Sequence, residues 1–87
     1  MPIVSYTSYD YKSMKVVPVI ASFDTEGHIK PLYVRIESNS YKIHSYWVKS
    51  CFVNVSEFHC QVLDGDILRP LVLSYYQSEG IWGIPPP

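Results

Sequence analysis

The stretch V-S-E-F-H-C-Q-V-L at residues 55–63 carries the strongest structural signal in this sequence. Its apolar residues Phe58, Cys60 and Val62 alternate with polar ones. Successive side chains of a β-strand point to opposite faces of a sheet, so this period of two predicts a strand with one buried face. The turn residues Asp64-Gly65-Asp66 come directly after it and predict a tight reversal of the chain.

Similar stretches recur about every ten residues, and turn residues separate them. The chain has ten Val, eight Ile and eight Tyr but only one Ala, a composition that favours strands over helices. Residues 48–54 fit either a bent continuation of the preceding strand or an irregular connection. The predicted strands are 15–23, 28–37, 41–47, 55–63, 67–76 and 81–84.

The short links between these strands predict antiparallel pairing in chain order, and closure into a barrel would remove exposed strand edges. Pro18, Pro31 and Pro70 lie inside three of the strand patterns. Proline lacks a backbone N–H, so each should mark a sheet edge, a bulge or a strand start. We therefore predict an all-β fold, a small antiparallel barrel of five or six bent strands that is SH3-like more than OB-like.

The apolar phase of each strand supplies the predicted core. Trp82, in the short last strand, is expected to cover one open end of the barrel. The expected core residues are Val17, Val19, Ala21, Leu32, Val34, Ile36, Ile43, Phe58, Cys60, Val62, Leu71 and Leu73.

The 87 residues are enough for one domain, which we place at residues 14–84. Residues 1–13 are polar and aromatic, and they fit either a tail or an extra edge strand. Residues 85–87 are three prolines, which cannot join a sheet and are expected to form a polyproline tail. A core this small leaves a domain marginally stable, so we expect support from a protein partner or from a homodimer.

Charge and hydropathy exclude several classes of protein. Seven Lys and Arg against eight Asp and Glu give a net charge of −1, unlike a strongly basic nucleic-acid binder. No apolar run approaches the roughly 18 residues of a membrane span, and no segment resembles a signal peptide. We therefore expect a cytoplasmic protein without membrane contact, in which Cys51 and Cys60 are free thiols.

The residues that carry chemistry do not form an enzyme or metal motif. His59 and Cys60 are adjacent, so on a strand they face opposite sides and cannot share a zinc ion. Cys60 falls on the apolar phase, which favours an inert thiol over a nucleophile. The carboxylates beside Gly27 and Gly65 are ordinary turn residues. We therefore predict no enzymatic activity, no metal site and no cofactor.

The run A-S-F-D-T-E-G-H-I-K-P-L at residues 21–32 contains the pattern F-D-x-x-G-x-I-x-P. This pattern resembles the opening of short, uncharacterised bacterial all-β proteins, in which a first hairpin leads into a strand with basic and hydrophobic residues. The resemblance implies a small β-barrel from a bacterial cytoplasm. It implies no activity and no functional residue, because that family has no assigned activity.

The chain has thirteen aromatic residues, more than a core this small can enclose, so several should reach the surface. Tyr and Trp dominate binding interfaces, because they bury a large area at a low entropy cost. The pair Tyr75-Tyr76 places one ring on each face of its strand, and with Tyr75 inside, Tyr76 points outward. We therefore predict a non-enzymatic interaction module that associates with itself or binds another protein.

The alternative function is weak binding of single-stranded nucleic acid, because small β-barrels stack bases on aromatic side chains beside basic ones. Tyr33 and Arg35 share one face of their strand, and aromatic and basic residues interleave again at 41–49. A stripe that mixes the two kinds of residue would favour nucleic acid, whereas an uncharged aromatic patch would favour a protein partner. The candidate binding residues are Tyr33, Arg35, Lys42, Tyr46, Trp47 and Tyr76.

Overall fold

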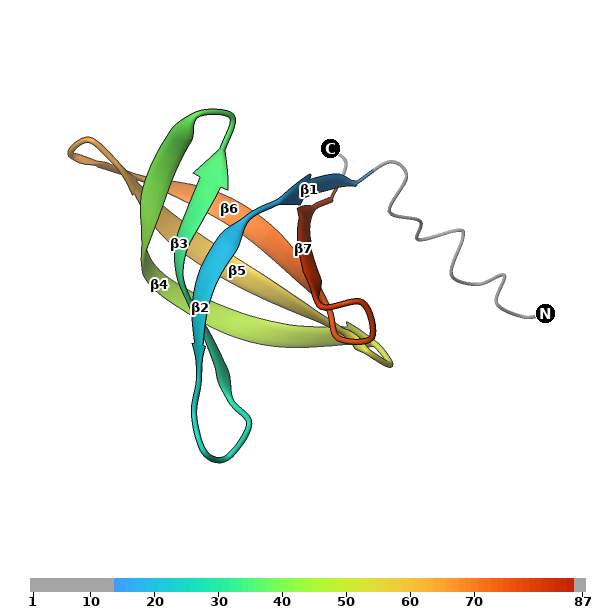
Figure 1. The fold of residues 1–87 in the computed structure, drawn as a ribbon. Coiled ribbons are helices and arrows are strands. Elements are labelled where there is room, and N and C mark those ends of the chain that lie inside the picture. The colour runs from blue at the N-terminus through green and yellow to red at the C-terminus, as the bar shows by residue number, and fades with distance from the viewer. Residues whose placement is uncertain (1–13, 86–87) are drawn as a thin grey trace.

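The computed structural model describes residues 14–85, except for the side chains of residues 50–52. The predictions for residues 1–13 and for the end of the polyproline tail fall outside the described residues. The described chain is all-β, as the alternation predicts, and contains no helix (Figure 1). Its seven strands are β1 (Lys15–Val17), β2 (Val19–Phe23), β3 (Ile29–Ile36), β4 (Asn39–Phe52), β5 (Val55–Asp64), β6 (Ile67–Tyr76) and β7 (Ile81–Ile84).

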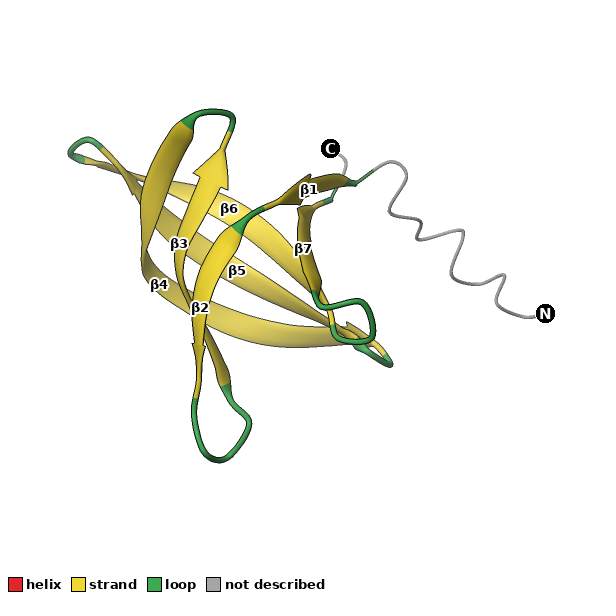
Figure 2. Cartoon of the chain, in the orientation of Figure 1, coloured by secondary structure: helices red, strands yellow, loops and turns green. Residues whose placement is uncertain are grey.

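All seven strands belong to one antiparallel sheet, in the order β1-β7-β6-β5-β4-β3-β2. The sheet curls into a half-barrel, as Figure 2 shows. β1 and β2 lie at the two ends of the sheet, yet only Pro18 separates them along the chain. The backbone N–H of Arg35 in β3 donates to the carbonyl oxygen of Pro18 at 3.1 Å. This hydrogen bond holds the junction between the two sheet ends against β3.

Pro18 explains the main difference between the predicted and observed strands. The sequence predicts one strand over 15–23, whereas the structure divides this stretch into β1 and β2. Proline cannot donate a ladder hydrogen bond, and the chain bends there to pass from one end of the sheet to the other. The division gives seven strands where the sequence predicts five or six. At 48–54 the structure continues the preceding strand, because β4 extends from Asn39 to Phe52.

A β-bulge changes the alternation of β3. Ile20 pairs with Tyr33, and Ala21 pairs with Pro31, which leaves Leu32 as an extra residue. An extra residue disrupts the ladder and bends the strand. Pro31 is fully buried, whereas Leu32 is half-buried and lies outside the core cluster. The bulge therefore explains why the prediction of Leu32 as a core residue is wrong.

A second bulge changes the alternation of β4. Ile43 and Ser45 pair with consecutive residues of β5, which leaves His44 as an extra residue. One extra residue moves the later side chains of a strand to the opposite face. Ile43 and Tyr46 therefore both face the core, and Trp47 faces away from it.

The core fills the inner face of the curled sheet. Leu73 and Val34 are among its most completely buried side chains. The ring of Trp82 lies 5.2 Å from that of Phe58 and 4.7 Å from that of Tyr75, so Trp82 is part of the core. The buried cluster consists of Val17, Val34, Ile43, Phe58, Cys60, Val62, Leu73 and Trp82, with the predicted core residues Val19, Ala21, Ile36 and Leu71 packed against it.

A second, smaller apolar cluster lies on the outer face, the side of the sheet opposite the core. Met14, Val55 and Tyr76 are buried in it, and Ile81 packs against them. The register of the sheet places Val55, Tyr76 and Ile81 side by side on β5, β6 and β7. Met14 lies over Gly83, where the absence of a side chain leaves room for it.

A methyl group at Gly83 would overlap the side chain of Met14. We predict that Gly83→Ala displaces Met14 and lowers the free energy of unfolding by about 1.5–3 kcal/mol, the range for exposing one large apolar side chain. Urea denaturation measures this change. In the Met14→Ala background the same glycine substitution should have little further effect, because the clash is gone. Additive losses in the double variant would contradict the proposed contact.

Candidate interaction surface

Trp47 is a large aromatic side chain that the fold leaves 58% exposed. It lies on the outer face of β4, directly opposite His59 of β5. The two rings stack with their centroids 4.2 Å apart and their planes 9° apart. Stacking restricts the indole ring to one orientation, so its free face is presented to solvent in a defined way.

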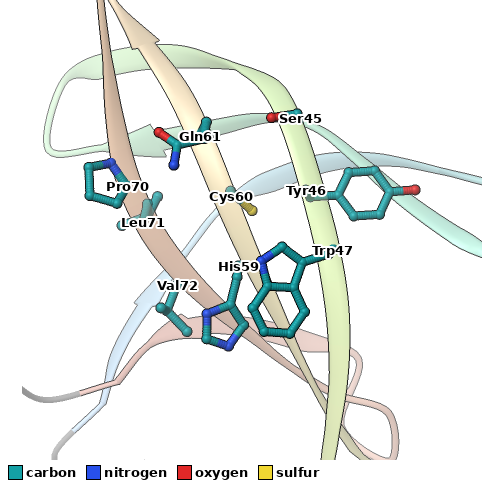
Figure 3. Close-up of a pocket in the computed structure, with 9 residues that line it drawn as sticks. All are labelled: Ser45, Tyr46, Trp47, His59, Cys60, Gln61, Pro70, Leu71 and Val72. Carbon is teal, nitrogen blue, oxygen red and sulfur yellow. The ribbon is translucent and has the colours of Figure 1, made fainter.

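A shallow depression of about 260 Å³ surrounds this stack (Figure 3). It spans the three neighbouring strands β4, β5 and β6, and the side chains of Trp47, His59 and Val72 lie together on one side of it. Among the described residues, no Asp, Glu, Lys or Arg side chain lines it, so it suits an apolar or aromatic group of a ligand. Its lining residues are Ser45, Tyr46, Trp47, His59, Cys60, Gln61, Pro70, Leu71 and Val72.

Opposite charges lie side by side next to this depression. The Oε1 atom of Glu57 is 2.9 Å from Nε2 of His59, within hydrogen-bonding distance. Lys49 of β4 is the direct cross-strand neighbour of Glu57. A cation and an anion in directly opposite positions offset each other. The surface around Trp47 is therefore close to neutral.

A separate basic group lies where β3 pairs with β4. Tyr33 and Lys42 are direct cross-strand neighbours, and Arg35 follows Tyr33 by two residues on the same face. Among the described residues, no carboxylate lies within ion-pair distance of Arg35 or Lys42. Lys15 and Arg69, by contrast, pair with carboxylates at 3.0 and 2.7 Å. This end of the outer face is therefore positively charged and carries one exposed aromatic ring.

The structure brings together some of the predicted binding residues and separates others. Tyr46 lies on the inner face, with its ring centroid 5.7 Å from that of Phe58, because the bulge in β4 turns it toward the core. Tyr76 is on the outer face as expected, but Met14 and its neighbours bury it. The predicted residues that share the exposed outer face are Tyr33, Arg35, Lys42 and Trp47.

The pairing of His59 with Trp47 is not predicted by the sequence. A regular hairpin through the β4–β5 turn would place Trp47 opposite Cys60, on the core side. An irregularity near the end of β4 shifts the register by one residue, and His59 takes that position. No local pattern of apolar and polar residues signals this shift, because the bulge depends on how two strands pair.

The thiol of Cys60 is free and buried in the core. Its Sγ atom lies 3.6 Å from the carbonyl oxygen of Phe58 and can donate a weak hydrogen bond to it. Burial disfavours the charged thiolate and raises the pKa of Cys60 to about 11. A nucleophilic cysteine requires a lowered pKa and access to substrate, and this thiol has neither.

Asp24 stabilises the turn between β2 and β3. Its Oδ1 atom accepts the backbone N–H groups of His28, at 2.8 Å, and Glu26, at 2.9 Å. Its Oδ2 atom lies 3.1 Å from Nδ1 of His28. The hydrogen bond from the backbone of His28 is the main cause that lowers the pKa of Asp24. This carboxylate is therefore engaged within its own hairpin, as the turn pattern predicts.

The described residues hold no group of three or more His, Cys, Asp or Glu side chains that could bind a metal ion. Within the same part of the chain, no helix is long and apolar enough to cross a membrane. No protein-family model, curated protein or solved structure matches this sequence or its fold.

We predict that Cys60 reacts with a thiol reagent only when the chain unfolds. Because its pKa is about 11, only about one thiol in a thousand is ionised at pH 8, and burial blocks access. The labelling rate is measured in a Cys51→Ser variant, in native buffer and in urea. Equal labelling rates in the two solvents would contradict the buried position.

The raised pKa of Cys60 also predicts how stability depends on pH. The free energy of unfolding should fall as the pH rises from the unfolded pKa, about 9, toward 11, because the unfolded chain then loses the thiol proton that the folded chain keeps.

Proposed function

We propose that this chain is a non-enzymatic interaction module, an SH3-like small β-barrel that binds a segment of a partner protein on its outer face. The observation that carries the proposal is the exposed indole of Trp47, stacked on His59 in an uncharged depression. The curled antiparallel sheet with its bent strands supports the SH3-like assignment. In this proposal the module works in the cytoplasm, where its thiol stays reduced, and it uses no cofactor.

A protein segment fits this surface better than a small molecule does. The depression is shallow and open, whereas small-molecule sites are concave and enclose most of their ligand. An exposed, oriented tryptophan is the kind of residue that contributes most to protein interfaces. The neutral surroundings of Trp47 favour an apolar or aromatic anchor side chain from the partner.

The charges at the edge of the surface add a second requirement. Arg35 and Lys42 lie on the same face as Trp47, and no carboxylate of the described residues pairs with them. Complementary charge steers a partner and fixes its orientation more than it adds affinity. The expected partner segment therefore carries an apolar anchor with acidic residues on one side of it.

Single-stranded nucleic acid is the second candidate ligand, and Tyr33 with its basic neighbours supports it. A base stacked on Tyr33 would place its phosphates near Arg35 and Lys42. Two observations make this candidate the weaker one. The most exposed ring on the face, Trp47, has neutral surroundings, and Lys49 beside it is offset by Glu57. Affinity for phosphates comes mainly from cations, and few are concentrated here.

Selection from a random-peptide display library tests the proposal. The full chain is the bait. A counter-selection against the Trp47→Ala variant removes peptides that bind to other parts of the chain. We expect the selected peptides to share an apolar or aromatic residue flanked by acidic ones. For the best peptide, Trp47→Ala should raise the Kd roughly 30-fold, the effect of losing a contact worth about 2 kcal/mol. Isothermal titration calorimetry measures the Kd.

Ile67→Ala is the matched control, because Ile67 is also 58% exposed but lies beside the β5–β6 turn, outside the depression. It should leave the Kd unchanged. A parallel titration uses a labelled single-stranded RNA of mixed sequence at low salt. Peptides that bind the Trp47→Ala variant equally well would refute the proposal. An RNA complex that Lys42→Glu abolishes, without any peptide that needs Trp47, would establish the second candidate instead.

A further inference from the structure

β2 forms one end of the sheet, and this edge is open. Its only strand partner among the described residues is β3, so the backbone groups on its other side have no partner strand there. The β2–β3 hairpin projects away from the body of the half-barrel, with its turn as the far end (Figure 1). An open edge presents a row of N–H and C=O groups to which another extended strand can add.

The other open edges carry features that oppose strand addition. Residues 67–73 of β6 have no β7 partner, and this stretch contains Arg69 and Pro70. The part of β4 that lies beyond its pairing with β3 contains Lys49 and two irregularities. β1 has only three residues and begins with Lys15. Charged residues, prolines, bulges and short length are the usual protections of an edge strand.

β2 lacks charge and proline. Its sequence is V-I-A-S-F, and five residues is an ordinary strand length. Ile20 is 63% exposed and Phe23 is 59% exposed, so both leave apolar surface beside the open edge. An uncharged, apolar edge of this kind is suited to pairing with another strand. Its chemistry therefore calls for an extended, apolar segment as its occupant.

We propose that the occupant is β2 of a second copy of this chain, paired antiparallel about a twofold axis near Ala21. In that register Ala21 faces its own counterpart, and Phe23 faces Val19 of the second copy. A small residue at the axis lets the backbones approach, and an aromatic ring opposite a β-branched side chain is a favourable cross-strand pair. Twofold symmetry is the commonest arrangement of protein dimers.

β2 is itself an extended, uncharged and apolar segment, so a second copy supplies the kind of occupant that this edge calls for. A five-residue edge makes a small interface, so the dimer is weak and depends on concentration. This dimer uses a different surface from that around Trp47 and does not rest on the proposed function.

Light scattering on the full chain, from micromolar to millimolar concentration, tests the dimer. The mass should rise from 10.0 kDa toward twice that value. Ile20→Lys places a charge beside the open edge, and the chain should then stay monomeric at every concentration. Val53→Lys is the matched control, because Val53 is 85% exposed at the β4–β5 turn and carries the same change of charge away from the edge. This control should dimerise as the natural sequence does.

Phe23→Lys serves as a second variant of the edge, and the far-ultraviolet circular dichroism spectrum checks that each variant is folded. Concentration-dependent shifts of amide resonances should map to β2. A natural chain that stays monomeric at millimolar concentration would overturn the proposal, as would a dimer that both lysine variants of β2 retain. A dimer that Trp47→Ala abolishes would overturn it as well, because self-association would then use the outer face.

Discussion

The half-barrel depends on one covalent constraint, the single residue Pro18 between the strands at the two ends of the sheet. Because β1 and β2 are consecutive in the chain, the sheet must curl until its ends approach each other. The hydrogen bond from Arg35 to the carbonyl of Pro18 holds one side of this junction against β3, and the pairing of β1 with β7 holds the other side. The curl then defines an inner face, where Leu73 and Val34 are excluded from water, and an outer face that keeps Trp47 exposed.

Most of the fold could be predicted from the sequence, because alternation is a local property that each strand carries in its own residues. The strands that follow the first hairpin lie within two residues of their predicted bounds, except that β4 continues five residues beyond the predicted end at 47. Every residue of the buried cluster except Trp82 is among the predicted core residues. The predictions that differ arise at backbone irregularities. Pro18 was expected to disturb a strand, but the sequence does not say that it joins the two sheet ends.

The candidate site was harder to predict, because it depends on how strands pair. Strict alternation from the core residue Ile43 would turn Trp47 inward and Tyr46 outward, and the extra residue His44 reverses both. A register shift later in β4 then places His59 under the indole. Tyr76 faces outward as its strand pattern predicts, but a distant part of the chain covers it. Contacts between segments far apart in sequence leave no local signal.

The outer face and the open edge of β2 give this small domain two separate surfaces for association, and the curl around Pro18 sets how they lie relative to the core. Exchange of backbone amides with deuterated solvent on the two sides of Pro18 tests that arrangement most directly. If the sheet is curled, the Arg35 amide, which donates to the carbonyl of Pro18, and the β1 amides that bond to β7 are protected together with those of the central strand β5. Free exchange throughout β1, while Arg35 and β5 stay protected, would show that the two ends of the sheet do not meet at Pro18.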